Sequence, residues 1–133
     1  MAKTSKKRKA VDKKVDSEKL YLLDEALALV NDESVVFLDV RDEPELARDG
    51  KVPGAIHASR GMLEFLVDPE SPYHAPIFAS GKKFLIYCAS GGRSALAAQR
   101  LQEMGLNSVG HLGGGIKAWK EINGPIEAVN GQG

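Results

Sequence analysis

Two dense apolar runs dominate the hydrophobic pattern of this chain. They cover residues 35–40 and 84–88, and a short run with little polar alternation is typical of a strand buried on both faces. Shorter strands are predicted over residues 55–58 and 108–112. Because helical segments separate these strands, the pattern predicts an α/β fold with a mostly parallel sheet covered by helices on both faces.

The helices are predicted from caps, prolines and glycines that lie between the apolar runs. Asp24 is a suitable N-cap, Pro44 is suited to the first turn of a helix, and Gly105 is suited to the end of one. The stretch 68–80 contains three prolines and is predicted to be a loop. The predicted helices cover residues 25–31, 44–48, 62–67, 94–104 and 116–122.

Charge divides the chain into an arm and a domain. Residues 1–19 carry eight Lys or Arg and three acidic residues, a net charge of +5, so the remainder of this neutral chain carries −5. We predict a disordered basic arm over 1–16, one folded domain over 17–129 and a flexible tail over 130–133. A nuclear address or nucleic-acid tether in the arm is the alternative interpretation. The acidic domain itself is not expected to bind nucleic acid.

Composition limits the chemistry further. A single cysteine excludes an internal disulfide, and no group of residues has the spacing of a zinc site, so neither a metal nor another cofactor is expected. A reducing, cytoplasmic setting fits this cysteine usage. The sequence has no apolar run long enough to span a membrane, and its basic N-terminus lacks the apolar core of a secretory signal.

The single cysteine, Cys88, occupies an informative position. It ends the predicted strand 84–88 and precedes a glycine-rich turn that leads into a helix from Ser94. Backbone N–H groups and the positive end of a helix dipole at such a position favour the thiolate, which is the nucleophilic form. The alternative is that Cys88 is only a small buried hydrophobic residue. The glycines and Arg93 favour the functional interpretation.

The turn can curl so that its N–H groups point at one centre. Gly91 and Gly92 are expected to permit that curvature, and the N–H groups of the turn would then form a cradle for an anion. Arg93 could aim its guanidinium over the cradle or brace the turn from outside. The candidate substrate-binding residues are Ala89, Ser90, Gly91, Gly92, Arg93 and Ser94.

A thiolate held in this way is suited to sulfur transfer. It attacks sulfur readily, displacing sulfite from thiosulfate and leaving a persulfide on Cys88 that a second nucleophile would collect. No histidine is adjacent in sequence to act as a base. The loop is one residue shorter than a Cys-x5-Arg phosphatase loop, so its cradle should suit one sulfur atom better than a phosphoryl group.

Four segments together resemble the single-domain rhodanese family. Residues 88–93 are similar to its active-site loop, and 38–41 (Leu-Asp-Val-Arg) to its Asp-Val-Arg strand end. Residues 51–57 resemble its hydrophobic-Pro-Gly-Ala segment, and 112–119 its closing Leu-x-Gly-Gly-x-x-x-Trp. The resemblance covers roughly residues 20–127, with the motifs in the family's order.

The resemblance implies a three-layer fold with a central, mostly parallel, five-stranded sheet and sulfurtransferase activity at Cys88. It also implies that Asp39 and Arg41 mainly hold strand ends and loops together beneath the site. Many members carry Arg directly after the cysteine, where this chain has Ala89. Arg60 could supply the missing attraction for anions, or it could be an ordinary solvated arginine.

The expected partners are a small anionic sulfur donor, thiosulfate or another persulfide, and an external acceptor, which would be cyanide, a thiol or a protein. Two alternatives remain open from the sequence. One is a carrier module that only receives and passes on persulfide. The other is a cysteine-dependent phosphatase or arsenate reductase of related shape.

Overall fold

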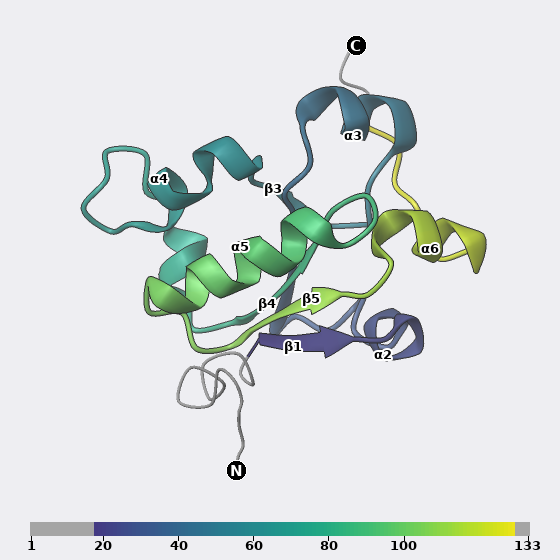
Figure 1. Cartoon of the computed structure of the whole chain (residues 1–133), viewed down its shortest axis with the longest axis horizontal. Coiled ribbons are helices and arrows are strands. Elements are labelled where there is room, and N and C mark those ends of the chain that lie inside the picture. Colours follow the sequence, from purple (N-terminus) through teal and green to yellow (C-terminus); the bar gives the residue numbers. More distant parts are fainter. Residues whose placement is uncertain (1–17, 130–133) are drawn as a thin grey trace.

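The computed structural model describes residues 18–129, so the expected basic arm and tail lie outside the described residues. A five-stranded sheet forms the centre, with strand order β1-β5-β4-β2-β3 and every neighbouring pair parallel (Figure 1). The strands are β1 (Glu18–Tyr21), β2 (Val35–Asp39), β3 (Ile56–His57), β4 (Lys83–Tyr87) and β5 (Val109–Leu112). The predicted α/β class and five-stranded parallel sheet are therefore confirmed.

Helices cover both faces of the sheet and complete the three layers (Figure 1). None of the described helices is long and apolar enough to cross a membrane. They are α2 (Leu23–Leu27), α3 (Glu43–Asp49), α4 (Leu63–Val67), α5 (Gly92–Glu103) and α6 (Gly115–Glu121), with short 3-10 helices η1 (Arg60–Met62) and η2 (Pro76–Ala79).

Alternating side chains of the central strands build two separate cores. In β4, Phe84 and Ile86 pack with α4 and α5, whereas Leu85 and Tyr87 pack with α2 and α6. A strand whose side chains alternate between two apolar layers reads as a continuous apolar run, which explains the pattern seen in the sequence. Cys88 continues the same alternation and belongs to the core under α4 and α5.

The edge strand β1 was not among the predicted strands. It is short, and it pairs with β5 in parallel. Tyr21 is its buried anchor and packs across Gly110, where an added Cβ would lie only 2.3 Å from the tyrosine ring. A four-residue edge strand can be held to the core by a single buried side chain. Such a strand produces no clear hydrophobic pattern in the sequence.

The helical boundaries also differ from the prediction: α3, α4, α5 and α6 shift by one or two residues, and the first helix shifts most. The first helix begins at Leu23, ahead of the predicted cap Asp24, because the Glu25 carboxylate accepts the Leu22 N–H at 2.9 Å. It ends at Leu27, and the following residues continue as turns. The predicted loop over 68–80 contains η2, which begins at Pro76, a residue suited to a first turn.

Candidate functional site

Cys88 lies where β4 stops and the chain turns into α5. The N-cap of α5 is Gly91, whose φ of 119° is in the left-handed region that side chains disfavour. Cys88 itself is 1% exposed, so its sulfur faces inward from the turn. The turn therefore wraps around a covered thiol at the carboxyl end of the central strand.

Backbone amides of the turn point at this sulfur. The N–H groups of Gly91 and Ser94 donate to Cys88 Sγ at 3.2 and 3.4 Å, and Ser94 Oγ lies 3.5 Å from it. Burial would raise the pKa of the Cys88 thiol, but hydrogen bonds from Ser94, Gly91 and the Ser90 N–H outweigh burial and lower that pKa. The surroundings therefore favour the thiolate, as the sequence-based hypothesis requires.

The two glycines of the turn have different roles. Gly91 requires its positive φ, whereas Gly92 has ordinary helical geometry, and an added Cβ there would contact nothing within 4 Å. The expectation that both glycines permit the curvature is therefore wrong for Gly92. The two residues cannot be told apart in a sequence, because only the backbone angle distinguishes them.

Helix α6 supports the turn from behind. The N–H groups of Ile116 and Lys117 donate to the carbonyls of Cys88 and Ala89 at 2.9 and 3.1 Å. This close approach requires Gly115, since a Cβ there would lie 2.4 Å from the Ala89 oxygen. Two carbonyls of the turn are thereby satisfied from outside, which leaves its N–H groups free to point at the sulfur.

Arg93 braces the turn from outside. Its guanidinium makes a two-bond pair with the Glu45 carboxylate of α3, at 2.8 and 2.9 Å, the geometry that arginine forms best. This pair lowers the pKa of Glu45 to about 2. Of the two roles considered for Arg93, the geometry favours the brace. Glu45 was not a predicted site residue, because nothing local links two positions 48 residues apart.

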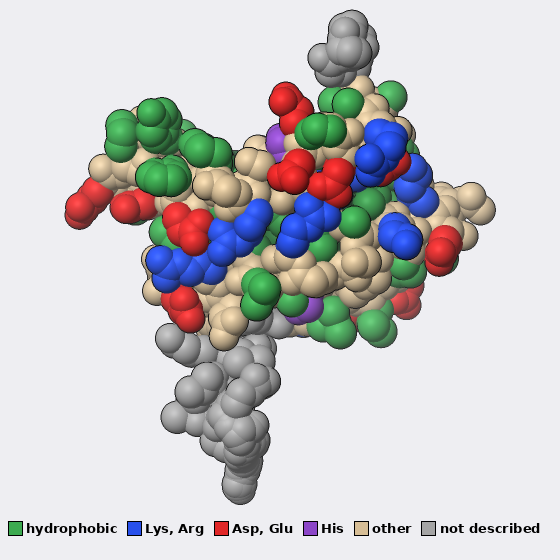
Figure 2. Space-filling model, turned by 45° about the horizontal axis from the view of Figure 1, so that its top comes forward, with side chains coloured by type: hydrophobic (Ala, Val, Ile, Leu, Met, Phe, Trp, Pro, Cys, Tyr) green, Lys and Arg blue, Asp and Glu red, His purple; other side chains and the backbone are tan. Residues whose placement is uncertain are grey.

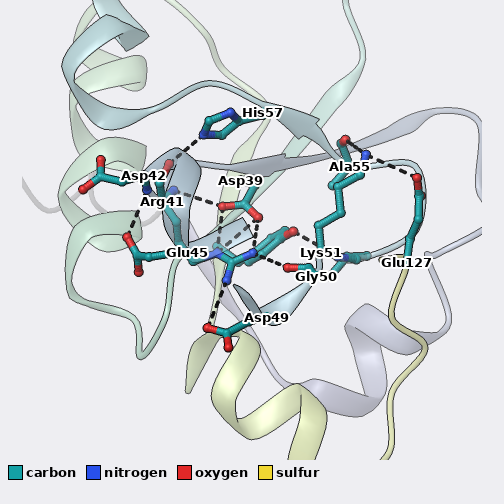
Figure 3. Close-up of polar contacts among 12 residues, drawn as sticks. Asp39, Arg41, Asp42, Glu45, Asp49, Gly50, Lys51, Ala55, His57 and Glu127 are labelled. Atoms are coloured by element: carbon teal, nitrogen blue, oxygen red, sulfur yellow. Dashed lines mark hydrogen bonds and ion pairs between the residues drawn. The ribbon is translucent and has the colours of Figure 1, made fainter. Parts of the chain in front are cut away.

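Asp39 and Arg41 form a second brace below the turn, and both side chains are fully buried (Figure 3). Arg41 Nε and Nη2 donate to the Asp39 carboxylate at distances down to 2.8 Å, and Nη2 also reaches the Gly50 carbonyl at 2.6 Å. Arg41 Nη1 lies 3.9 Å from Asp49. The pair thus ties the end of β2 to the end of α3.

The remaining candidates contribute less to the geometry around the sulfur. Ser90 is exposed and acts through its backbone N–H, and Ala89 is partly exposed. Arg60 pairs with Glu64 at 2.8 Å one turn further along, so its charge is compensated there. Among residues 18–129, no three His, Cys, Asp or Glu side chains are grouped as a metal site would need.

Comparisons with known proteins agree on one family. Residues 22–122 match the family model of the rhodanese-like domain. Thiosulfate sulfurtransferase GlpE of Vibrio cholerae is 30% identical over 104 residues, which cover 77% of this chain and 89% of that protein. The mouse thiosulfate sulfurtransferase/rhodanese-like domain-containing protein 3 is 28% identical over 100 residues, covering 71% of this chain but only 64% of the mouse protein.

A solved structure from Rhodopseudomonas palustris is more similar still. It is 46% identical, with a TM-score of 0.82, and the match covers 96% of this chain and 99% of that one. That protein, RPA3614, is described as being of unknown function and a possible tyrosine phosphatase. The family match extends over most of the chain, across every motif that surrounds Cys88 and both of its braces, and so the chain belongs to the rhodanese family.

Proposed function

We propose that this protein is a sulfurtransferase that carries a sulfane sulfur as a persulfide on Cys88. Family membership and the sulfurtransferase names of its relatives support the reaction class. The observation that carries the proposal is the pair of amides, from Gly91 and Ser94, that donate to Cys88 Sγ. Such donors stabilise negative charge on sulfur, first as the thiolate and then as the persulfide anion.

The first half-reaction transfers one neutral sulfur atom. The Cys88 thiolate attacks the outer sulfur of thiosulfate, a new S–S bond forms, and the old S–S bond breaks with its electron pair leaving on sulfite. One thiolate and one thiosulfate dianion give one persulfide anion and one sulfite dianion, so charge balances. The tight turn, closed by Gly91 and backed by α6, suits a single added sulfur atom.

The second half-reaction returns the enzyme to its starting state. An acceptor anion, cyanide or a thiolate, attacks the outer sulfur of the persulfide, and the Cys88 thiolate leaves with the electron pair of the S–S bond. The chain holds no other cysteine that could take the sulfur internally. The acceptor must therefore come from outside, and the kinetics should be ping-pong.

A phosphatase is the second candidate, since the similar R. palustris protein is described as a possible tyrosine phosphatase. Phosphate chemistry needs an arginine free to bind the phosphoryl oxygens. Here Arg93 is held by both oxygens of Glu45, and the loop is one residue shorter than a Cys-x5-Arg loop. These two features favour sulfur transfer.

The test is to mix the protein with thiosulfate and cyanide and to follow thiocyanate, with Cys88→Ser as the matched variant. We expect turnover by the natural protein and none by the variant, because a hydroxyl at this position cannot form a persulfide. Mass spectrometry should find one extra sulfur atom on Cys88 after thiosulfate alone.

The alternatives give different results. An extra sulfur on Cys88 without thiocyanate would indicate the carrier module instead of the enzyme. Hydrolysis of a chromogenic phosphate ester that is lost in Cys88→Ser, with no sulfur retained by the natural protein, would overturn the proposal in favour of a phosphatase.

A further inference from the structure

A cavity of about 300 Å³ lies directly beside the active-site turn, between α3 and α6. Ala89 and Ile116 line it on the side of the turn. Three cationic side chains, Arg48, Lys117 and Lys120, line it from the two helices. Figure 2 shows Lys and Arg side chains gathered over α3 and α6. We call this space the α6 cavity.

The charges around the α6 cavity are only partly compensated. Its two carboxylates, Asp49 and Glu121, face three cations, and Asp49 is already paired with Arg48 at 2.9 Å. Lys120 Nζ donates to the backbone carbonyl of Asp49, which carries no net charge. The exposed Lys117 ammonium makes no hydrogen bond or ion pair with the described residues. The cavity therefore has positive charge available for an anion.

The backbone of α6 is hydrogen-bonded to the turn that carries the nucleophile. The Lys117 N–H donates to the Ala89 carbonyl, and the Ile116 N–H donates to the Cys88 carbonyl. Lys117 thus projects its flexible four-carbon stem from a backbone that is hydrogen-bonded to the turn itself. Ala89 contributes only a methyl group to the α6 cavity, so the cationic side chains of α3 and α6 supply its positive charge.

We propose that the α6 cavity binds the anionic end of a low-molecular-weight thiol that accepts sulfur from Cys88. This proposal rests on the sulfurtransferase function proposed above. The persulfide is an anion, and a thiolate that also carries a carboxylate is repelled by it. Lys117 and Lys120 offset that repulsion and hold the carboxylate while the thiolate attacks the outer sulfur, giving the acceptor persulfide and the free Cys88 thiolate.

The experiment compares three thiols that differ in the charge of their tail: 3-mercaptopropionate, 2-mercaptoethanol and 2-aminoethanethiol. Thiosulfate is saturating and sulfite release is measured, so one readout serves every acceptor. In ping-pong kinetics, kcat/KM for the acceptor reports the second half-reaction alone. For each thiol, kcat/KM of Lys117→Gln is divided by kcat/KM of the natural protein. The intrinsic reactivity of the thiol cancels in this ratio.

We expect kcat/KM of Lys117→Gln to fall about threefold for 3-mercaptopropionate, the effect of one partly exposed charge pair. It should be unchanged for 2-mercaptoethanol and should rise for 2-aminoethanethiol. The double variant K117Q/K120Q should extend the loss to about tenfold, and added salt should reduce it. Lys82→Gln removes the same charge one residue before β4, at the far end of the sheet, and should change none of the three ratios.

Equal changes for all three thiols in Lys117→Gln, or the same changes in Lys82→Gln, would overturn the α6 cavity as the acceptor site. In that case thiocyanate formation with cyanide would still stand, and with it the proposed function. If the natural protein releases no sulfite with any acceptor, cyanide included, the sulfurtransferase function itself fails.

Discussion

The two ends of the sheet differ in chemistry far more than in shape. The amino end holds the larger cavity, of about 370 Å³, whereas the α6 cavity at the carboxyl end measures about 300 Å³. Among residues 18–129, Lys82 is the only ionisable side chain that lines the amino-end cavity. The carboxyl end brings together the covered thiol, the amides of its turn and the Asp39–Arg41 pair.

One helix explains much of the contrast. Helix α5 begins at Gly92, so its unpaired N–H groups lie beside Cys88. It ends at Glu103, and the residues that follow, Gly105 and Leu106, line the amino-end cavity. The same dipole therefore favours an anion at one end of the sheet and disfavours it at the other. Cavity volume alone would point to the amino end, away from the thiol.

The largest expected effect concerns the buried pair at the carboxyl end. Arg41→Met removes the cation and leaves the Asp39 carboxylate buried without its partner. Loss of one member of a buried pair costs about 3–5 kcal/mol of unfolding free energy. The measurement is urea unfolding, with Lys82→Gln at the amino end as the control, where a change within about 0.5 kcal/mol is expected. Equal losses in the two variants would remove the distinction between the ends.

A smaller effect is expected at the turn. Gly91→Ala places a side chain at a φ of 119°, a strain of about 1–2 kcal/mol that the turn can relieve by changing shape. The Gly91 N–H would then leave Cys88 Sγ, and loss of one such donor should lower kcat for sulfur transfer at least about tenfold. Thiocyanate formation measures this, and unfolding measures the stability cost.

Gly92→Ala is the matched control for that experiment. Gly92 is helical and has open space at the Cβ position, and alanine is favoured over glycine within a helix by about 1 kcal/mol. The variant should therefore transfer sulfur normally and be equally or more stable. Loss of transfer in Gly92→Ala, or normal transfer in Gly91→Ala, would contradict the role given to the turn's curvature.

These two glycines also show where sequence reasoning ends. The central strands and the turn after Cys88 were predictable because each is a local feature: a dense apolar run, a glycine pair, a helix start. Which glycine carries the strain depends on one backbone angle, and no local pattern encodes it. Strand β1 was not predicted because its one buried side chain, Tyr21, packs over Gly110. A contact between residues so far apart leaves no local pattern in the sequence.

Contacts between distant segments were equally hidden. The sequence marks Glu45 as part of a helix start, and its carboxylate does accept the Asp42 N–H at 3.0 Å. Its pairing with Arg93 depends on the folded chain, which brings the first turn of α3 close to the first turn of α5. The same holds for Gly115, whose closeness to Ala89 arises from the position of α6.

The smallest expected effect is the pH dependence of the Glu45–Arg93 pair, which Glu45→Gln tests by removing charge and keeping shape. Arg93 lowers the pKa of Glu45 from 4.5 to about 2, so the unfolded chain takes up this proton before the folded one does. The pair therefore stabilises the fold above about pH 4.5, by about 1 kcal/mol because both side chains are partly exposed. Urea unfolding should show a lower free energy of unfolding for Glu45→Gln than for the natural protein at pH 7, and the difference should shrink as the pH falls towards 2.

Lys82→Gln, at the other end of the sheet, is the control and should show no pH-dependent difference in unfolding free energy. A difference for Glu45→Gln that stays constant with pH would mean that the charge of Glu45 does not brace the turn.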